Sequence, residues 1–217
     1  MFKITILSLF FFISGFTFGQ SQTQDVDLKD YYFPIKKLQK GKIYTYINAS
    51  DSSERYNWLV QTKINKGDTL VLTQVKDSKG RLTEEVIQEV SKTGMIMQAY
   101  KIIDYKDNKT KQKVCQVKEP YMYNWLQMPE DSVTWSVSYY DSTYSKNFEL
   151  KKTRVFKKLD PERDLAKFSD YYYVKVGESQ LFDHEVTSYY KRDVGLYKYT
   201  ILYRNGVTKV FILSGQK

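Results

Sequence analysis

Apolar and polar side chains alternate in segment after segment of this chain, and this pattern constrains its fold more than any other feature. Successive side chains of an extended strand point to opposite faces, so a period of two predicts strands that each bury one face. The 20 Tyr and 12 Phe suit such strands. The residues expected to share a face are Tyr56, Trp58, Val60 and Thr62; Val71, Thr73 and Val75; Val133, Trp135, Val137 and Tyr139; and Tyr197, Tyr199, Ile201 and Tyr203.

Turn signals separate the alternating segments at intervals of about 8–12 residues, which favours sequential antiparallel strands over strand–helix–strand units. The clearest is Asn205-Gly206, a typical two-residue hairpin turn. Others lie at 65–68, 77–80 and 91–94. About a dozen strands that each hide one face predict a strongly curved antiparallel meander (a half-barrel, clam or barrel), with a β-sandwich as the alternative.

Helix signals are few. The segment 160–168 opens with Asp160-Pro161 and clustered acids, which predicts a short connecting helix. The segment 121–128 is a second, weaker helix candidate. The rest of the chain from residue 31 to residue 217 is expected to form a single antiparallel β domain.

The first 19 residues have the layout of a secretory signal peptide. Lys3 precedes an almost wholly apolar run from Ile4 to Phe18, and small residues stand at Thr17 and Gly19. This run is shorter than the roughly 20 residues that a spanning helix needs, so an uncleaved anchor is the weaker interpretation. We therefore expect export to the periplasm, the cell surface or the medium, a disordered polar leader over residues 20–30, and no transmembrane segment after cleavage.

The chain is basic, with a formal net charge of +9. A basic balance favours anionic partners, and export argues against nucleic acid. The densest basic stretch, a candidate patch for an anionic partner such as lipid head groups, is Lys151, Lys152, Arg154, Lys157 and Lys158. The alternative is that these side chains protect an edge strand from pairing with other chains.

Two phrases of the sequence resemble exported bacterial proteins of unknown function. Tyr31-Tyr32-Phe33-Pro34-Ile35, followed by 41–46, is similar to their opening, and Tyr189-Tyr190 with 193–199 is similar to their close. That group resembles the curved antiparallel sheets of periplasmic half-barrel and β-clam proteins, including lipoprotein carriers. The resemblance implies a fold and no site residues. Residues 36–40 lengthen the link to Gly41, and the chain has no lipid-anchor cysteine after the apolar run, so it departs from the group there.

Residues for familiar catalytic chemistry are scarce. His184 and Cys115 are each the only residue of their type, which leaves too few ligands for zinc and no activated thiol, and no cofactor motif is present. Strand geometry predicts that Asp183 and Glu185 point away from His184. We expect no enzyme; a hydrolase that uses a carboxylate pair is kept as an alternative. The paired carboxylates are Glu84 with Glu85, Asp104 with Asp107, and Asp160 with Glu162 and Asp164.

Aromatic excess is the remaining functional signal. We expect a non-catalytic envelope protein, a monomer that binds a lipid, an amphipathic small molecule or an envelope protein on a concave aromatic face. A surface glycan-binding module that uses exposed Tyr with Trp58, Trp125 or Trp135 is the alternative, and cross-strand pairing of rings could also explain the excess. The candidate ligand-binding residues are Trp58, Trp135, Tyr139, Tyr172 and Tyr190.

Overall fold

The computed structural model describes residues 25–32, 38, 41–106 and 109–216. These residues form almost only strands, with one short helix, α1 (Lys29–Tyr32). The strands are β1 (Val26–Asp27), β2 (Lys42–Asn48), β3 (Arg55–Asn65), β4 (Asp68–Lys76), β5 (Leu82–Val90), β6 (Gly94–Lys106), β7 (Lys109–Glu119), β8 (Tyr121–Asn124), β9 (Leu126–Gln127), β10 (Ser132–Asp141), β11 (Lys146–Asp160), β12 (Leu165–Val176), β13 (Ser179–Lys191), β14 (Gly195–Tyr203) and β15 (Thr208–Gln216).

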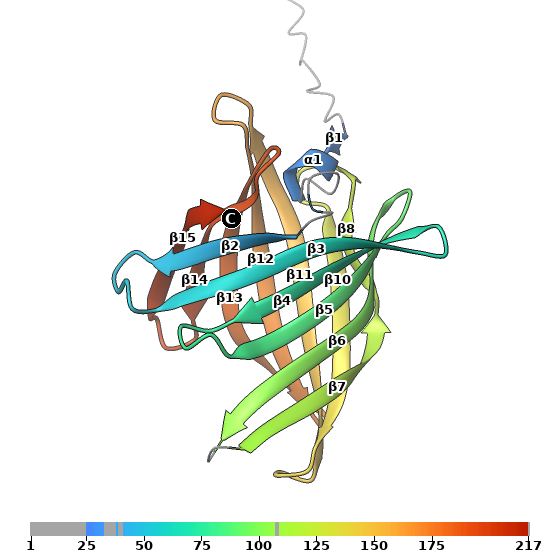
Figure 1. The fold of residues 1–217 in the computed structure, drawn as a ribbon, viewed down its shortest axis with the longest axis vertical. Helices are drawn as coiled ribbons and strands as arrows, with labels where there is room; N and C mark the ends of the chain where they lie inside the picture. The colour runs from blue at the N-terminus through green and yellow to red at the C-terminus, as the bar shows by residue number, and fades with distance from the viewer. Residues whose placement is uncertain (1–24, 33–37, 39–40, 107–108, 217) are drawn as a thin grey trace, which may run out of the picture.

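The main sheet is an antiparallel meander that closes on itself (Figure 1). Neighbouring strands follow the order β5-β4-β3-β2-β15-β14-β13-β12-β11-β10-β7-β6, and β5 also pairs with β6. The result is a 12-strand barrel, with β8 added beside β6. The prediction of a strongly curved meander is confirmed in its barrel form, and the sandwich alternative is wrong. Closure leaves these twelve strands without a free edge.

The hairpins fall where the turn residues predicted them. Asn205-Gly206 joins β14 to β15, with Gly206 at φ 81° and the Val207 amide donating to the Asn205 side chain. The turns at 65–68, 77–80 and 91–94 join β3 to β4, β4 to β5 and β5 to β6. Local turn chemistry therefore sets the register of these strand pairs.

The alternating faces also match the prediction, with one exception. In β4 the side chains of Val71, Thr73 and Val75 are buried and face the barrel interior. In β14, however, Tyr197 is exposed while Leu196 is buried. A β-bulge between β13 and β14 explains this difference: Tyr190 pairs with Leu196, so Tyr197 is the extra residue and the inward face shifts by one position.

Both helix predictions are wrong. Residues 161–164 form the turn between β11 and β12, with Asp164 at φ 54°, and 165–168 are already strand. The segment 121–128 contains β8 and β9. In each case pairing with neighbouring strands outweighs the weak local preference of a short segment. Tyr31 and Tyr32 lie in α1 and are both buried.

Helix α1 covers one end of the barrel, where it contacts β13 and β14 (Figure 1). The Tyr31 hydroxyl donates to Asp164 at 2.8 Å and accepts from Arg192 at 3.0 Å, so the helix is tied to the turns after β11 and β13. The adjacent Tyr32 is fully buried and inserts between the rings of Tyr123 and Phe168, at centroid distances of 4.3 and 5.5 Å. This end of the barrel is therefore filled by side chains.

The predicted signal peptide, residues 1–19, lies outside the described residues. Of the predicted leader, residues 26–30 carry β1 and the start of α1. Among the described residues no helix is long and apolar enough to cross a bilayer.

Candidate functional site

The barrel interior holds a cavity of about 440 Å³, a size within the usual range for small-molecule sites. Its walls come from the inward faces of strands all around the barrel, from β3 to β15. Much of the lining is aromatic. The rings that the site is built on are Trp58, Tyr100, Trp135, Tyr172, Tyr190 and Tyr199.

A buried ion pair lies at the deep side of the cavity. Arg154 on β11 donates to both carboxylate oxygens of Asp170 on the neighbouring β12, through Nε at 2.6 Å and Nη2 at 2.9 Å. Ser188 donates to the same carboxylate at 3.2 Å, and Arg154 Nη2 also contacts the Tyr190 hydroxyl at 3.0 Å. The nearby guanidinium holds the pKa of Asp170 below its usual value despite burial. Bidentate geometry of this kind fixes both side chains.

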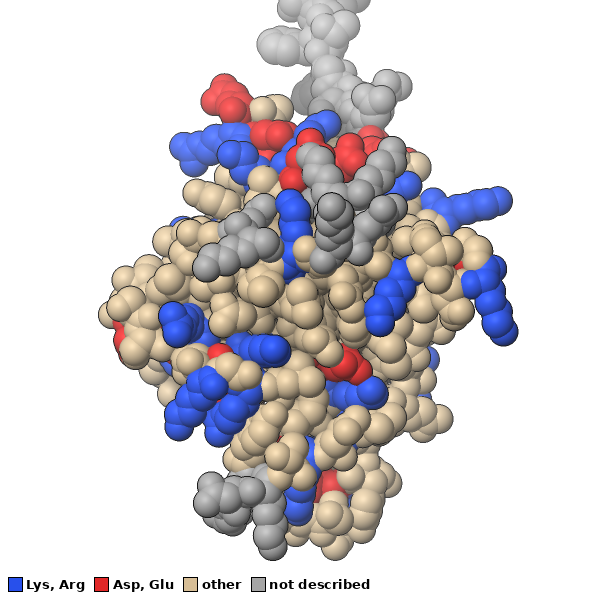
Figure 2. Space-filling model, in the orientation of Figure 1, with Lys and Arg blue, Asp and Glu red and all other residues tan. Residues whose placement is uncertain are grey.

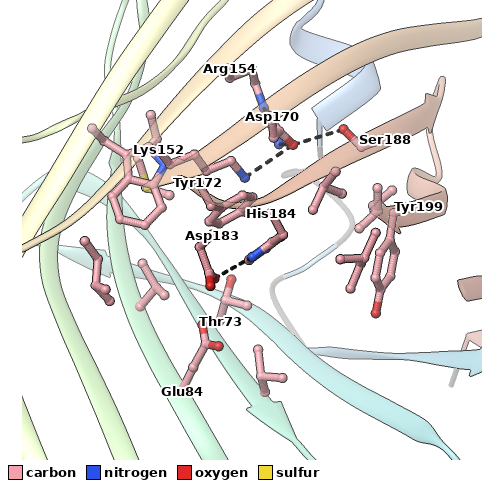
Figure 3. A pocket seen from close by; sticks show the side chains of 18 of the residues that line it. Thr73, Glu84, Lys152, Arg154, Asp170, Tyr172, Asp183, His184, Ser188 and Tyr199 are labelled. Carbon is pink, nitrogen blue, oxygen red and sulfur yellow. Dashed lines mark hydrogen bonds and ion pairs between the residues drawn. The ribbon is translucent and has the colours of Figure 1, made fainter. Parts of the chain in front are cut away.

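Lys152 lies two residues before Arg154, on the same inward face of β11. Its Nζ is 3.3 Å from Asp170 Oδ2 and 4.8 Å from the centre of the Tyr172 ring. Burial lowers the pKa of this ammonium to about 8, because desolvation outweighs the attraction of Asp170. The contact of Lys152 with the Asp170 carboxylate is longer than either hydrogen bond from Arg154 (Figure 3).

Glu84 on β5 and Lys152 on β11 reach the cavity from different walls (Figure 3). The Tyr100 hydroxyl donates to Glu84 Oε2 at 2.9 Å. Burial nevertheless raises the pKa of the Glu84 carboxyl, and the charge of Lys152 only partly opposes that effect. The cavity thus holds an acid whose charged form is disfavoured and a base whose charged form is disfavoured.

His184 and Asp183 form a pair at the cavity wall, contrary to the sequence prediction. Nδ1 of His184 is 2.7 Å from Asp183 Oδ2, and the His184 ring stacks on Tyr172 at 4.2 Å. The prediction that Asp183 points away is wrong because β13 is bulged here: Tyr172 pairs with His184 and Tyr173 with Phe182, which leaves Asp183 as the extra residue. No short-range sequence signal marked this bulge.

Side-chain exposure rises steadily across these residues, and this gradient locates the side that communicates with solvent. The exposed fraction is 2% for Asp170, 11% for Lys152, 20% for His184 and 56% for Asp183. Asp183 lies near the β12–β13 turn, at the end of the barrel opposite α1. The cavity is therefore closed by α1 and the Tyr32 ring at one end and reaches solvent on the Asp183 side.

Four of the five predicted ligand-binding residues line this cavity: Trp58, Trp135, Tyr172 and Tyr190. Tyr139 does not. Its ring stacks on Phe148 at 5.5 Å and lies under the ammonium of Lys113, beside a separate depression between β7 and β10. Cys115 is buried, which raises the pKa of its thiol to about 11.

The predicted basic patch is not one surface. Lys152 and Arg154 face the barrel interior, whereas Lys157 and Lys158 are on the outer side, where Lys157 pairs with Glu130. The edge-strand explanation is also wrong, because β11 lies between β10 and β12. The error came from grouping Lys151, Lys152, Arg154, Lys157 and Lys158 by sequence distance, although a strand sends neighbours to opposite faces. Elsewhere on the visible face, Lys and Arg lie in several separate groups (Figure 2).

Asp170, Ser188, Tyr199 and Glu84 were not selected as site residues. A signal for Asp170 exists: it stands between Phe168 and Tyr172, at the inward parity of β12, where a lone carboxylate needs a buried partner. Glu84 belonged to a predicted carboxylate pair, but Glu85 faces outward and pairs with Lys101. Among the described residues no three His, Cys, Asp or Glu side chains are grouped to hold a metal ion.

Comparisons with known proteins find similarity only at the level of fold. No family model and no curated protein matches the sequence. A crystal structure of a Bacteroides fragilis protein, inferred to be exported and described as having a YmcC-like fold, aligns with a TM-score of 0.53 at 10% identity, over 86% of this chain and 99% of that one. A protein of Parabacteroides distasonis inferred to be a lipoprotein aligns at 0.48 and 12% identity over the same shares. The chain thus has the YmcC-like fold.

Proposed function

We propose that this chain is an exported, non-catalytic binding protein that holds an amphipathic molecule in the cavity of its barrel. The observation that carries the proposal is the combination inside one cavity of an aromatic wall with a small set of buried ionisable groups. Ligand sites typically join a mostly apolar lining to a few placed polar groups, and this arrangement suits a ligand with one apolar part and one polar end.

The aromatic wall suits the apolar part of the ligand. Tyr199 packs between Phe211 and Tyr46, at centroid distances of 4.8 and 5.5 Å, and Trp58 lies edge-on to Tyr46 at 5.2 Å. Rings held in this way present rigid apolar surface at little cost in conformational entropy. The polar part of the ligand would meet Lys152 and Glu84.

Export is supported by the layout of residues 1–19 as a signal peptide. The B. fragilis protein of the same fold is itself inferred to be exported. At 10% identity that likeness carries the fold alone, so the destination of this chain belongs to the proposal.

Native mass spectrometry of the protein purified from its own envelope fraction tests the proposal. We expect a reproducible added mass that disappears after extraction with organic solvent. The matched variants are Thr73→Phe, which fills the cavity from β4, and Thr110→Phe, on an exposed position of β7 that does not line it. Loss of the added mass in the first variant alone supports the cavity as the site. A wild-type protein that carries no ligand contradicts the proposal.

A hydrolase with a carboxylate pair is the second candidate, because Glu84 and Asp170 face the same cavity. Asp170 is already engaged by Arg154, Lys152 and Ser188, which leaves it poorly placed as a general base or nucleophile. Hydrolysis of any ester or glycoside that Glu84→Gln abolishes would favour the hydrolase over the binding protein. The glycan-binding alternative required exposed tryptophans. Trp125 and Trp135 are buried and Trp58 faces the cavity, so these three residues do not support it.

A further inference from the structure

We infer that the polar end of the ligand is an anion, a carboxylate or a phosphate monoester, and that Lys152 binds it. This inference rests on the proposed function and names the ligand's chemical class. Its basis is the balance of hydrogen-bond donors and acceptors around the cavity.

Two cavity-lining side chains in the described part of the chain have a fully buried polar atom with no hydrogen-bond partner: Trp58, through Nε1, and Arg154, through Nη1. Both atoms are donors and neither can accept. Aromatic rings surround the guanidinium of Arg154, the nearest being Tyr123 at 4.6 Å, but a ring is a weak substitute for an acceptor oxygen. These two atoms are enclosed by the wall and do not themselves meet a guest, but they show that hydrogen-bond donors exceed acceptors on this side of the cavity.

Lys152 adds a charge to this surplus of donors. Arg154 already takes both oxygens of Asp170, at 2.6 and 2.9 Å, which leaves Lys152 only a shared oxygen at 3.3 Å. An ammonium has three donors, and a single long contact in a buried site satisfies it poorly. A second anion near Nζ would complete its coordination. Lys152 is also more exposed than Arg154, so it is the cation that an entering ligand can reach.

Because the Glu84 carboxylate also lines the cavity, a cationic ligand is the alternative, and three observations argue against a cation. Glu84 already accepts a hydrogen bond from Tyr100, burial disfavours its charged form, and Lys152 contributes a positive charge to the same space. Asp183 at the exposed side would repel an anionic head group that stayed there, which favours its placement at the deep side beside Lys152.

The test is isothermal titration of the delipidated protein with four ten-carbon probes: decanoate, decyl phosphate, decan-1-ol and decylamine. We expect decanoate or decyl phosphate to bind about 10–100-fold more tightly than the alcohol, which is the usual value of hydrogen bonds to a charged group. The two anions distinguish a carboxylate from a phosphate. Lys152→Gln should remove this preference while binding of the alcohol changes by less than about 2-fold, since an apolar wall is unaffected.

Two further variants make the test independent of folding defects. Glu84→Gln removes a competing negative charge and keeps an acceptor for Tyr100, so anion binding should tighten by about 3–10-fold. Lys158→Gln, on the same strand but outward, should change nothing. Equal binding of acid and alcohol, or tightest binding of the amine, overturns the inference and leaves the proposed function standing. Failure of every probe, together with a ligand-free native protein, overturns both.

Discussion

The two halves of the barrel use aromatic and charged residues in opposite ways. In the half under α1, Tyr32 fills the space between strands, and Arg154 and Asp170 neutralise each other through two hydrogen bonds. In the half toward the β12–β13 turn, the same kinds of residue surround an open cavity, Lys152 lies 3.3 Å from its carboxylate partner, and Glu84 is bound by the neutral hydroxyl of Tyr100. The strands run through both halves, so the difference lies in side chains alone.

This contrast separates the residues that stabilise the barrel from those that are available to bind a ligand. Packed interiors leave few voids larger than a water molecule, so a cavity of about 440 Å³ forgoes contacts that larger side chains would supply. A buried ammonium whose charged form is disfavoured also lowers stability. Both costs fall in the open half. We conclude that the closed half stabilises the barrel, and that substitutions there should affect folding more than substitutions around the cavity.

The largest expected effect comes from breaking the ion pair of the closed half. Asp170→Asn leaves Arg154 buried without its counter-charge, which should lower the free energy of unfolding by about 3–5 kcal/mol. Urea denaturation followed by circular dichroism measures it. The control is Glu130→Gln, which removes the exposed ion pair with Lys157 and should cost less than about 1 kcal/mol. Equal effects of the two variants would contradict the assigned role of Asp170.

The next effect concerns the cavity ammonium and depends on pH. The folded pKa of Lys152, about 8, lies below its unfolded value of 10.5, so between these two values the unfolded chain binds more protons. The free energy of unfolding therefore rises with pH in this window, by up to about 3 kcal/mol. The penalty from burying the Lys152 ammonium is complete below pH 8 and disappears by pH 10.5.

Lys152→Met isolates this contribution, because every other titratable residue is the same in both proteins. The difference in unfolding free energy, wild type minus variant, should therefore increase from pH 7.5 to pH 9.5. Urea titrations at several pH values measure it. A difference that stays constant over this range would show that the pKa of Lys152 is not depressed.

How much of this contrast the sequence could predict depends on the length scale of each signal. Alternation and turn residues predicted the meander, because both act over a few residues: Val71, Thr73 and Val75 face inward as expected. Closure could not be predicted, since it depends on pairing of β2 with β15, the first and last barrel strands of the chain, after the ten barrel strands between them have set the curvature. The bulge at Asp183, which creates the pair with His184, likewise depends on register with β12.

The candidate site shows the same division. Trp58, Trp135, Tyr172 and Tyr190 were predicted to bind ligand from the excess of aromatic residues, and all four line the cavity. The charged part was misread: Lys152 and Arg154 were assigned to a surface patch, although they share the parity of the buried Phe156. In a strand of a closed sheet, the alternation of side chains decides which ones face the interior, even when they are charged. Nothing in the local sequence shows that β11 has a neighbouring strand on both sides.

A smaller effect is expected where α1 closes the barrel. Tyr32→Leu removes ring contacts with Tyr123, Phe168 and Tyr190 and the hydroxyl contact to Gln127, and it should lower the free energy of unfolding by about 2 kcal/mol. The comparison variant is Tyr144→Leu at an exposed position, which should change stability by less than about 0.5 kcal/mol. Chemical denaturation of both variants measures these changes. Equal changes in the two variants would show that α1 contacts the barrel without stabilising it.

The smallest effect is expected at the cavity wall, and it gives the sharpest comparison between the halves. His184→Gln removes a ring that stacks on Tyr172, a contact worth about 1 kcal/mol, at a position that is partly exposed and next to open space. Its urea midpoint should shift less than that of Tyr32→Leu, with an unchanged m-value. A larger shift than Tyr32→Leu would mean that the bulged pair of β13 stabilises the barrel itself, and the division between a stabilising half and an open half would fail. A shift within the expected range would mean that side chains near α1 contribute more to the free energy of unfolding than those around the cavity. The residues around the cavity can then be assigned to ligand binding.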